Sequence, residues 1–233
     1  MTKKCYFCTQ KPIKMDNISF KAALFDLDGV VFDTEPQYTE FWGSQCREFR
    51  PDRPGLEHEI KGQTLLQILD RHFDGDLKAK QSLIVERLNE FEKTMDFVFV
   101  SGFEAFVRQL RSNGVKTAVV TSSNLDKMNA VYNRCEGFKT LFDAILTSED
   151  FERSKPDPDC YLKASQRFDA TADECIVFED SFNGLKSGRA AKMKVVGLST
   201  TNSPESIAPY SDTVIANYLA FGYDDCLRLI QNS

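Results

Sequence analysis

Two carboxylates two residues apart are the most chemically informative feature of this sequence. Asp26 and Asp28, within Asp26-Leu27-Asp28-Gly29-Val30, follow the apolar run 22–25. Such a run, bounded by a turn, is typical of a buried strand. Like charges held this close raise a pKa or require a cation, so the pair could bind a metal or supply a nucleophile and an acid/base. The pair could equally form a polar turn, since Asp and Gly are common after strands.

Polar residues also follow three later apolar runs of strand length. These polar segments are Thr121-Ser122-Ser123-Asn124, Ser154-Lys155-Pro156-Asp157-Pro158 and Glu179-Asp180. Each has a structural alternative, because Lys155 could be a solvated turn residue and the other two segments could cap helices. Their recurrence after successive predicted strands favours a shared site.

The elements that must position these residues alternate along the chain. Apolar runs predict strands at 22–25, 115–120, 144–146, 176–178, 195–198 and 214–216, with helical periodicity between most of them. This alternation indicates an α/β fold with a doubly wound, mostly parallel sheet and right-handed crossovers. In such sheets ligands bind outside the carboxyl ends of the strands, near the switch in strand order. The polar segments should therefore meet in one place.

The segment 34–100 contains no convincing strand and predicts a small helical module. Thr34-Glu35-Pro36-Gln37 fits a capping box, with Thr34 as N-cap and Gln37 as its partner. The apolar and aromatic stripes that follow at helical spacing predict core packing. We expect three parts: a core domain of residues 19–33 and 101–233, a helical domain of residues 34–100, and a flexible tail of residues 1–18.

The composition limits the functions that the chain can have. Its formal net charge of −6 argues against nucleic-acid binding, which needs a basic face. Its longest apolar runs have strand length, so we expect no membrane partner. Only His58 and His72 occur, both away from the predicted strand ends. A Ser-His or Cys-His hydrolase is therefore disfavoured, and acid/base work falls to carboxylates.

The seven cysteines are scattered, and no apolar signal segment precedes them, which predicts reduced thiols in a cytoplasmic protein. Cys5 and Cys8 have the C-x-x-C spacing of zinc or redox sites. No second pair completes a zinc site and no strand precedes them, so we expect them to belong to the tail.

The groups expected at the sheet edge suit phosphoryl transfer. Carboxylate oxygens favour Mg²⁺, which shares phosphate oxygens. The Thr121 hydroxyl and the N–H groups of a turn that enters a helix form an anion cradle, and Lys155 adds positive charge. Asp26 and Asp28 are placed to supply the nucleophile and the acid/base. The expected partner is a small phosphorylated metabolite; the oligomeric state stays open, and a monomer is compatible with the sequence.

At this point the chain resembles the haloacid dehalogenase (HAD) superfamily. The resemblance rests on Asp26-x-Asp28-Gly29-Val30, the strand that ends in Thr121, Lys155-Pro156-x-Pro158, and Glu179-Asp180 with Asn183-Gly184. It extends over nearly everything from Phe20 onward and implies a HAD-like Rossmannoid core. The helical module resembles the cap of the β-phosphoglucomutase-like subfamily.

The resemblance implies a role for each motif residue. Asp26 attacks phosphorus and becomes an aspartyl phosphate, while Asp28 protonates the leaving group and then deprotonates the attacking water or hydroxyl. Mg²⁺ is bound by the Asp26 carboxylate, the Asp28 backbone carbonyl and Asp180, with Glu179 as a further ligand or as a support for the ligands. The residues expected to bind phosphate or substrate are Thr121, Ser122, Asn124, Lys155 and, on the cap, Lys61 and Gln63.

Departures from the mutase favour hydrolysis over isomerisation. Tyr38, Leu65 and Leu88 stand where the mutase has a histidine, an arginine and a lysine in its cap, and Asn124 stands where it has a further lysine. Each lost charge-assisted contact to a bisphosphate intermediate is worth roughly 1.5–3 kcal/mol. We predict a Mg²⁺-dependent phosphatase of small phosphorylated metabolites, with sugar phosphates as the expected substrates. The alternatives are β-phosphoglucomutase and a non-catalytic binding protein with the HAD fold.

Overall fold

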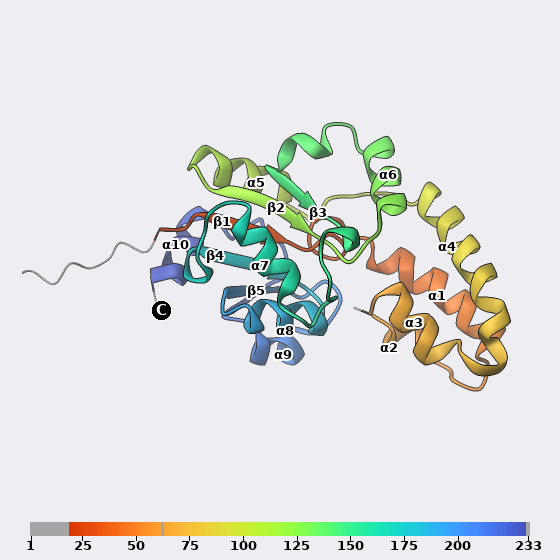
Figure 1. The fold of residues 1–233 in the computed structure, drawn as a ribbon. Coiled ribbons are helices and arrows are strands. Elements are labelled where there is room, and N and C mark those ends of the chain that lie inside the picture. The colour runs from red at the N-terminus through yellow and green to blue at the C-terminus, as the bar shows by residue number, and fades with distance from the viewer. Residues whose placement is uncertain (1–18, 62, 232–233) are drawn as a thin grey trace, which may run out of the picture.

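A six-stranded parallel sheet lies at the centre of the larger part of the molecule (Figure 1). The computed structural model describes residues 19–61 and 63–231 of the chain. The strands are β1 (Ala22–Phe25), β2 (Lys116–Val120), β3 (Ala144–Leu146), β4 (Cys175–Glu179), β5 (Lys194–Leu198) and β6 (Thr213–Ile215). Their order is β3-β2-β1-β4-β5-β6, and every neighbouring pair is parallel. The predicted α/β fold is confirmed; the expected tail, with Cys5 and Cys8, lies outside the described residues.

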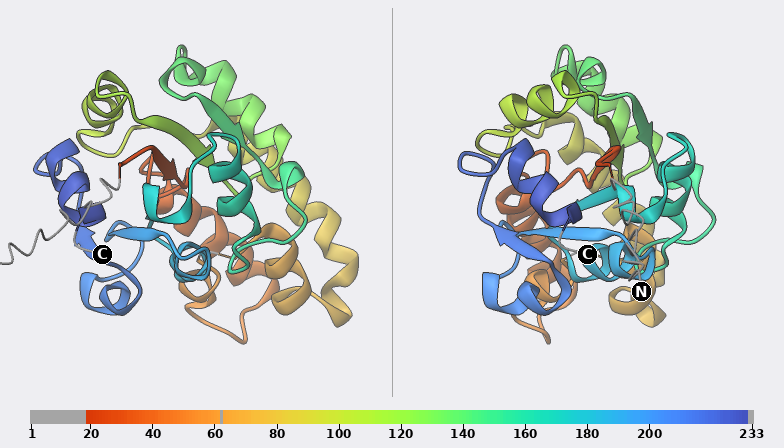
Figure 2. Two further views of the ribbon diagram at one scale, coloured as in Figure 1. Left: turned by 60° about the vertical axis from the view of Figure 1, so that its left-hand side comes forward. Right: turned by 90° about the vertical axis from the view of Figure 1, so that its left-hand side faces the viewer.

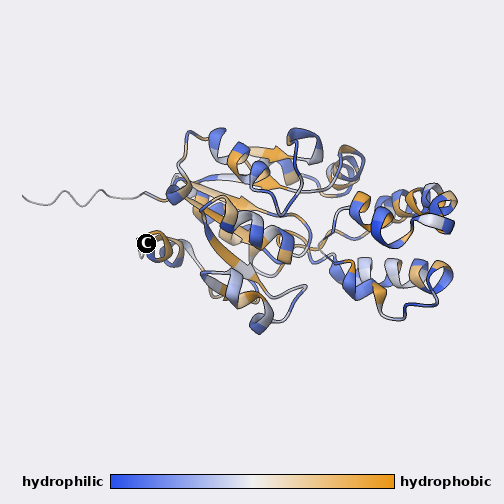
Figure 3. Ribbon diagram, turned by 60° about the horizontal axis from the view of Figure 1, so that its bottom comes forward, coloured by the Kyte–Doolittle hydropathy of each residue, from blue (hydrophilic) through white to orange (hydrophobic). Residues whose placement is uncertain are grey.

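Helices cover both faces of this sheet (Figure 2). Alternate residues of a strand point to opposite faces. On β1, Ala23 and Phe25 belong to one hydrophobic cluster, with residues of α5 (Phe103–Ser112), α6 (Leu125–Arg134) and α10 (Tyr223–Gln231). Ala22 and Leu24 belong to a second cluster, with residues of α7 (Asp159–Gln166), α8 (Phe182–Ala190) and α9 (Pro204–Ile207). Strands buried on both faces explain the continuous apolar runs, which are orange in Figure 3.

The strand order creates the point at which a site is expected. After β1 the chain builds the sheet outward through β2 and β3, then returns to the other side of β1 with β4. The loops that follow β1 and β4 therefore leave in opposite directions and open a crevice at the carboxyl ends. Three predicted segments begin there, namely Asp26-Leu27-Asp28, Thr121-Ser122-Ser123-Asn124 and Glu179-Asp180.

A module of helices lies beyond the carboxyl ends of the strands, on the side of the molecule away from α10 (Figures 1 and 2). It contains α1 (Glu35–Phe49), α2 (Leu56–Glu59), α3 (Leu65–His72) and α4 (Gln81–Thr94). Its hydrophobic cluster is separate from those of the sheet and includes Trp42, Phe73 and Ile84. The stripes predicted from the sequence thus pack against one another rather than against the sheet.

The two connections to this module run side by side. The Asp33 N–H donates to the Val98 carbonyl at 2.8 Å, and the Val100 N–H donates to the Val31 carbonyl at 2.9 Å. Because these paired linkers lie at the ends of the segment 34–100, we propose that it is a cap domain joined to the core there.

Some local details differ from the sequence-based expectations. Thr34 is the N-cap residue of α1, but its side chain does not cap the helix. Its hydroxyl donates to Asp28 Oδ1 at 2.6 Å instead, and the Gln37 side chain bonds to backbone atoms of Asp96. The predicted capping box is therefore wrong, and a true one occurs at Thr64 and Gln67.

The short helices α2 and α9 were not predicted, because one turn carries too little periodicity. Short 3₁₀ helices lie at Gly75–Lys80, Phe138–Leu141, Ser148–Asp150, Ala172–Glu174 and Ala208–Tyr210. No helix in the described part of the chain is long and apolar enough to cross a membrane.

Phe25 is the packing centre of the first hydrophobic cluster. Its ring stacks on Phe178 at 4.6 Å between centroids and meets Phe103 edge-on at 5.3 Å, and the side chain is fully buried. We expect Phe25→Ala to lower the free energy of unfolding by about 3–5 kcal/mol, because the cavity left behind adds to the lost burial. Chemical denaturation followed by circular dichroism would measure this. Leu219→Ala, at a residue 74% exposed, is the control and should change it by about 0.5 kcal/mol or less; equal effects would contradict the packing.

Candidate active site

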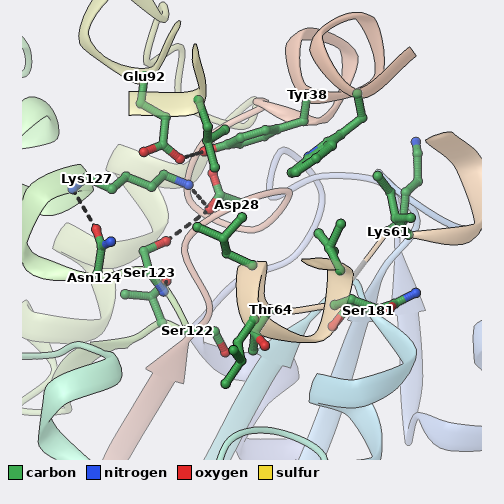
Figure 4. A pocket seen from close by; sticks show the side chains of 18 of the residues that line it. Asp28, Tyr38, Lys61, Thr64, Glu92, Ser122, Ser123, Asn124, Lys127 and Ser181 are labelled. Carbon is green, nitrogen blue, oxygen red and sulfur yellow. Dashed lines mark hydrogen bonds and ion pairs between the residues drawn. The ribbon is translucent and has the colours of Figure 1, made fainter. Parts of the chain in front are cut away.

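The predicted polar segments meet at a cavity of about 530 Å³ between the strand ends and the cap (Figure 4). The predicted site residues that line it are Asp26, Asp28, Thr121, Ser122, Asn124 and Asp180 from the core and Lys61 and Gln63 from the cap. Lys155 and Glu179 are absent from this lining; both are buried, and Lys155 contacts Asp26 from behind. Neither His58 nor His72 is among the described lining residues.

Lys155 is the centre of a buried polar network. Its Nζ donates to Asp26 Oδ1 at 2.6 Å, to Glu179 Oε1 at 2.7 Å and to the Val120 carbonyl at 2.9 Å. Burial opposes the lysine charge, but the carboxylates of Asp26 and Glu179 outweigh it and raise the pKa of Lys155 well above its usual value. Lys155 is therefore a fixed positive charge directly behind Asp26.

The carboxylates around this lysine carry more negative charge than it compensates. Burial raises the pKa of Asp26 to about 7, against the attraction of Lys155. Burial, with Glu179 and Asp26 nearby, also raises the pKa of Asp180 well above its usual value. One carboxylate oxygen from each of Asp26, Glu179 and Asp180 lies within 4.8 Å of the others. An all-oxygen set with unbalanced charge fits a hard divalent cation such as Mg²⁺.

Glu179 already uses both of its carboxylate oxygens. Oε1 accepts from Lys155 and from the Tyr161 hydroxyl at 2.9 Å, and Oε2 accepts from the Ser181 hydroxyl and the N–H groups of Asp180 and Ser181 at 3.1–3.2 Å. Because no lone pair points outward unused, this geometry favours the supporting role for Glu179 over that of a direct ligand. The same crowding requires Gly184, where a Cβ would lie 1.7 Å from Glu179 Oε1.

The carboxylate of Asp180 can lie close to that of Asp26 because the residue packed against Asp180 is a glycine, which has no side chain. Gly29 has φ = +76°, and a Cβ there would lie 2.2 Å from Asp180 Oδ2. The Thr201 hydroxyl donates to Asp180 Oδ2, and the Asn202 side chain donates to the Asp180 carbonyl at 2.9 Å. Gly29 in the first motif therefore leaves the space that the Asp180 carboxylate of the last motif occupies.

The side chain of Asp28 has a different set of partners from that of Asp26. Its Oδ1 accepts from Thr34 at 2.6 Å. Its Oδ2 accepts from Ser123 at 3.5 Å and pairs with Lys127 (Figure 4). The sequence predicts that the carboxylates of Asp26, Asp28, Glu179 and Asp180 meet at one edge of the sheet. Among the described residues, the group that could hold a metal contains three of them and leaves out Asp28. This separation leaves the Asp28 carboxylate available for proton transfer.

Lys127 is a residue that the sequence analysis missed. Its side chain is only 5% exposed, and its Nζ lies 4.6 Å from the ring centroid of Tyr38 on the cap. The Tyr38 hydroxyl donates to Glu92 Oε1 at 2.8 Å, so this cluster joins core and cap. The sequence did contain one signal of this role. A positive charge in the first turn of a helix is unfavourable because the helix dipole is positive there, so a lysine at that position is a reason to look for a function.

The predicted phosphate-binding segment has a mixed role. Thr121 Oγ1 accepts from the Ser123 N–H at 3.1 Å, and Asn124 Oδ1 caps α6 by accepting from the Lys127 N–H at 2.9 Å. The capping alternative for Asn124 is therefore correct, although Asn124 also lines the cavity.

The two predicted cap residues also have protein partners. Lys61 forms an ion pair with Glu35 at 3.3 Å, and Gln63 donates to the Glu59 carbonyl at 3.0 Å. Their side chains line the cavity while held by the cap itself.

Comparisons with known proteins show which proteins this chain is similar to. Residues 20–192 match the family model of haloacid dehalogenase-like hydrolases. Hexitol phosphatase A of Escherichia coli is 30% identical over 185 residues, which cover 76% of this chain and 82% of the relative. The validoxylamine A 7'-phosphate phosphatase of Streptomyces hygroscopicus subsp. limoneus is 28% identical over 193 residues, with 81% and 90% coverage. The chain spans 18% of the length of a further relative, SUPPRESSOR OF QUENCHING 1 of Arabidopsis thaliana, which is 29% identical over 192 residues and 78% of this chain.

Solved structures share the fold. A HAD hydrolase of family IA, variant 3, from Entamoeba histolytica superposes with a TM-score of 0.77 at 22% identity, over 91% of this chain and 100% of that one. The β-phosphoglucomutase of Clostridium difficile superposes with a TM-score of 0.74 at 20% identity, over 91% and 98%. Each superposition covers more than nine tenths of both chains.

The raised pKa of Asp26 predicts how metal binding depends on pH. Below about pH 7 Asp26 holds a proton that Mg²⁺ must displace, whereas above that pH the carboxylate is free. We therefore expect Mg²⁺ affinity to fall as the pH is lowered from 8 to 6, by up to about tenfold per unit below pH 7 for each displaced proton. Isothermal titration calorimetry with Mg²⁺ would measure it.

Two variants control that titration. Asp180→Asn should weaken Mg²⁺ binding strongly, whereas Asp28→Asn should keep most of the affinity, because only its backbone carbonyl is expected to reach the ion. An affinity that stays constant between pH 6 and pH 8 would contradict the assignment.

Proposed function

The chain belongs to the haloacid dehalogenase-like hydrolases, and we propose that it is a Mg²⁺-dependent phosphatase of small phosphorylated metabolites, with sugar phosphates as substrates. The observation that carries this proposal is the placement of two aspartates at one cavity with different partners. Asp26 lies beside the buried Lys155 and two further carboxylates, while Asp28 turns toward Thr34 and Lys127. One aspartate is therefore set for bond formation and the other for proton transfer.

Asp26 is the proposed nucleophile. Lys155 holds Oδ1 of Asp26, which leaves Oδ2 to attack phosphorus and form an aspartyl phosphate as the alcohol leaves. The positive charge of Lys155, the Thr121 hydroxyl and the N–H groups at the start of α6 stabilise negative charge on the phosphoryl oxygens. A Mg²⁺ ion, held by the carboxylates of Asp26 and Asp180 and the Asp28 carbonyl, would neutralise further charge there.

Asp28 is the proposed acid and base. It gives its proton to the departing alkoxide, then takes a proton from the water that attacks the aspartyl phosphate. Its partners Thr34 and Lys127 hold the carboxyl group in one orientation, and Thr34 is the first residue of the cap. Since Lys127 also lies against Tyr38, the position of the cap is coupled to the group that moves the proton.

Hydrolysis is favoured over isomerisation by the cap wall. Tyr38, Leu65 and Leu88 line the cavity, and the sequence resemblance aligns them with cationic or histidine side chains of the mutase. The similarity to the solved β-phosphoglucomutase of Clostridium difficile supports the fold but stays below 25% identity, so we keep mutase activity as the second candidate. We also propose that the protein acts in a reducing compartment such as the cytoplasm, because the described cysteines are free thiols.

A metabolite panel tests this function. With Mg²⁺, the protein should release inorganic phosphate from several sugar phosphates, and Asp26→Asn should lower kcat/KM by more than about a thousandfold because the nucleophile is lost. Phosphate release can be followed with molybdate. Activity that persists in Asp26→Asn would contradict the covalent mechanism, and no release by the unaltered protein would favour a binding protein.

A coupled assay separates phosphatase from mutase. With β-glucose 1-phosphate and the priming bisphosphate, we expect little glucose 6-phosphate relative to phosphate released. Faster isomerisation than hydrolysis would replace the phosphatase assignment by the mutase one.

Lys127 should act through Asp28. Lys127→Met removes a charge-assisted contact from Asp28, so we expect kcat to fall about tenfold to a hundredfold with a smaller change in KM. Lys127→Arg keeps the charge and should recover part of the loss. Steady-state kinetics on the best substrate measure both, and unchanged kcat in Lys127→Met with an intact fold would rule out this role.

A further inference from the structure

The cap side of the cavity differs in chemistry from the core side. Its wall is largely apolar, and includes Trp42, Ile60, Leu65, Leu66, Leu69 and Leu88. Leu66 is 68% exposed, so the cap presents a large apolar side chain to the space where the alcohol part of a phosphate ester must lie. Apolar walls lower the local dielectric constant and make an unpaired charge costly.

The charged groups on this wall are mainly carboxylates. Glu35, Glu57 and Glu92 line the cavity. Burial raises the pKa values of Glu35 and Glu92 above their usual range, although lysines nearby act in the opposite direction. None of these groups attracts an anionic substituent on the ligand, and Glu35 also offsets the positive charge of Lys61.

The cations of the cavity already have partners. In the described part of the chain, the lining cations are Lys61 and Lys127. Lys61 pairs with Glu35 at 3.3 Å, and Lys127 pairs with Asp28 beneath the Tyr38 ring. Lys155 is buried behind Asp26 and serves the transferred phosphoryl group. Each lining lysine therefore already faces a carboxylate that offsets its charge toward a second anion.

We infer that the substrates are phosphate monoesters whose alcohol part carries no second anionic group. Bisphosphates and phosphorylated acids would place an anion among carboxylates and apolar walls without a free cation. This inference rests on the proposed phosphatase function and specifies its substrate class.

Pairs of substrates that differ only by a carboxylate test the inference. Sorbitol 6-phosphate and 6-phosphogluconate share an open six-carbon chain, with CH₂OH in one and COO⁻ in the other; glycerol 3-phosphate and 3-phosphoglycerate form a second pair. With Mg²⁺ present, kcat/KM should be at least about tenfold higher for each alcohol than for its acid, because the acid must lose water around a carboxylate that gains no free cation in the cavity.

The outcomes are distinguishable. Equal or faster phosphate release from the acids would overturn the inference and leave the phosphatase function intact. No release from any of the four compounds, nor from p-nitrophenyl phosphate, would overturn both.

Two variants test the physical cause through different residues. Leu65→Arg adds a free cation to the wall and should reduce the preference for the alcohol about tenfold, whereas the matched control Leu65→Met should keep it. Glu35→Gln frees Lys61 from its ion pair and should reduce the preference severalfold. If Leu65→Arg does not fold, Glu35→Gln still tests whether the lack of a free cation causes the preference for the alcohol. A preference that stays unchanged in every folded variant would overturn that cause.

Discussion

One buried lysine joins the carboxyl ends of three adjacent strands. Lys155 Nζ bonds to Asp26 just after β1, to the Val120 carbonyl at the end of β2 and to Glu179 at the end of β4. Breaking such a buried ionic set by removing one member leaves the remaining charges uncompensated and typically costs about 3–5 kcal/mol. The polar network of the site therefore also joins the strand ends at the switch point of the sheet. Lys155 alone does not balance the charges of Asp26, Glu179 and Asp180, so a cation is needed as well.

The two aspartates of the first motif show how neighbouring residues acquire different chemistry. Asp26 faces the lysine and the other carboxylates, where burial raises its pKa to about 7. Asp28 faces the start of the cap and Lys127, which lies against a cap tyrosine. Because its partners come from both parts of the molecule, the proton transfer that we propose for Asp28 depends on the position of the cap. The same cap contributes the apolar wall with its carboxylates, so in our proposal one insertion both orients Asp28 and selects the substrate.

Much of this arrangement was predictable because parallel strands buried on both faces leave an unmistakable pattern. The runs 22–25, 144–146 and 176–178 form strands as expected, and the polar residues after them meet at the sheet edge. The failures concern side chains with several available partners. Thr34 fits a capping box, yet its hydroxyl donates to the carboxylate of Asp28, six residues earlier in the sequence. Lys127 has no local motif, and its partners Asp28 and Tyr38 lie 99 and 89 positions away.

The sequence by itself determined the α/β fold, the helical insertion and the four motif positions, since these depend on local periodicity and on residue type at strand ends. Only the tertiary structure decided how the carboxylates divide. In the folded chain the carboxylates of Asp26, Glu179 and Asp180 lie together, Asp28 forms an ion pair with Lys127, and Lys61 forms one with Glu35. Hydrogen bonds and ion pairs are assigned by competition among all groups brought within about 3 Å. That competition exists only after strands and helices far apart in the sequence have packed together.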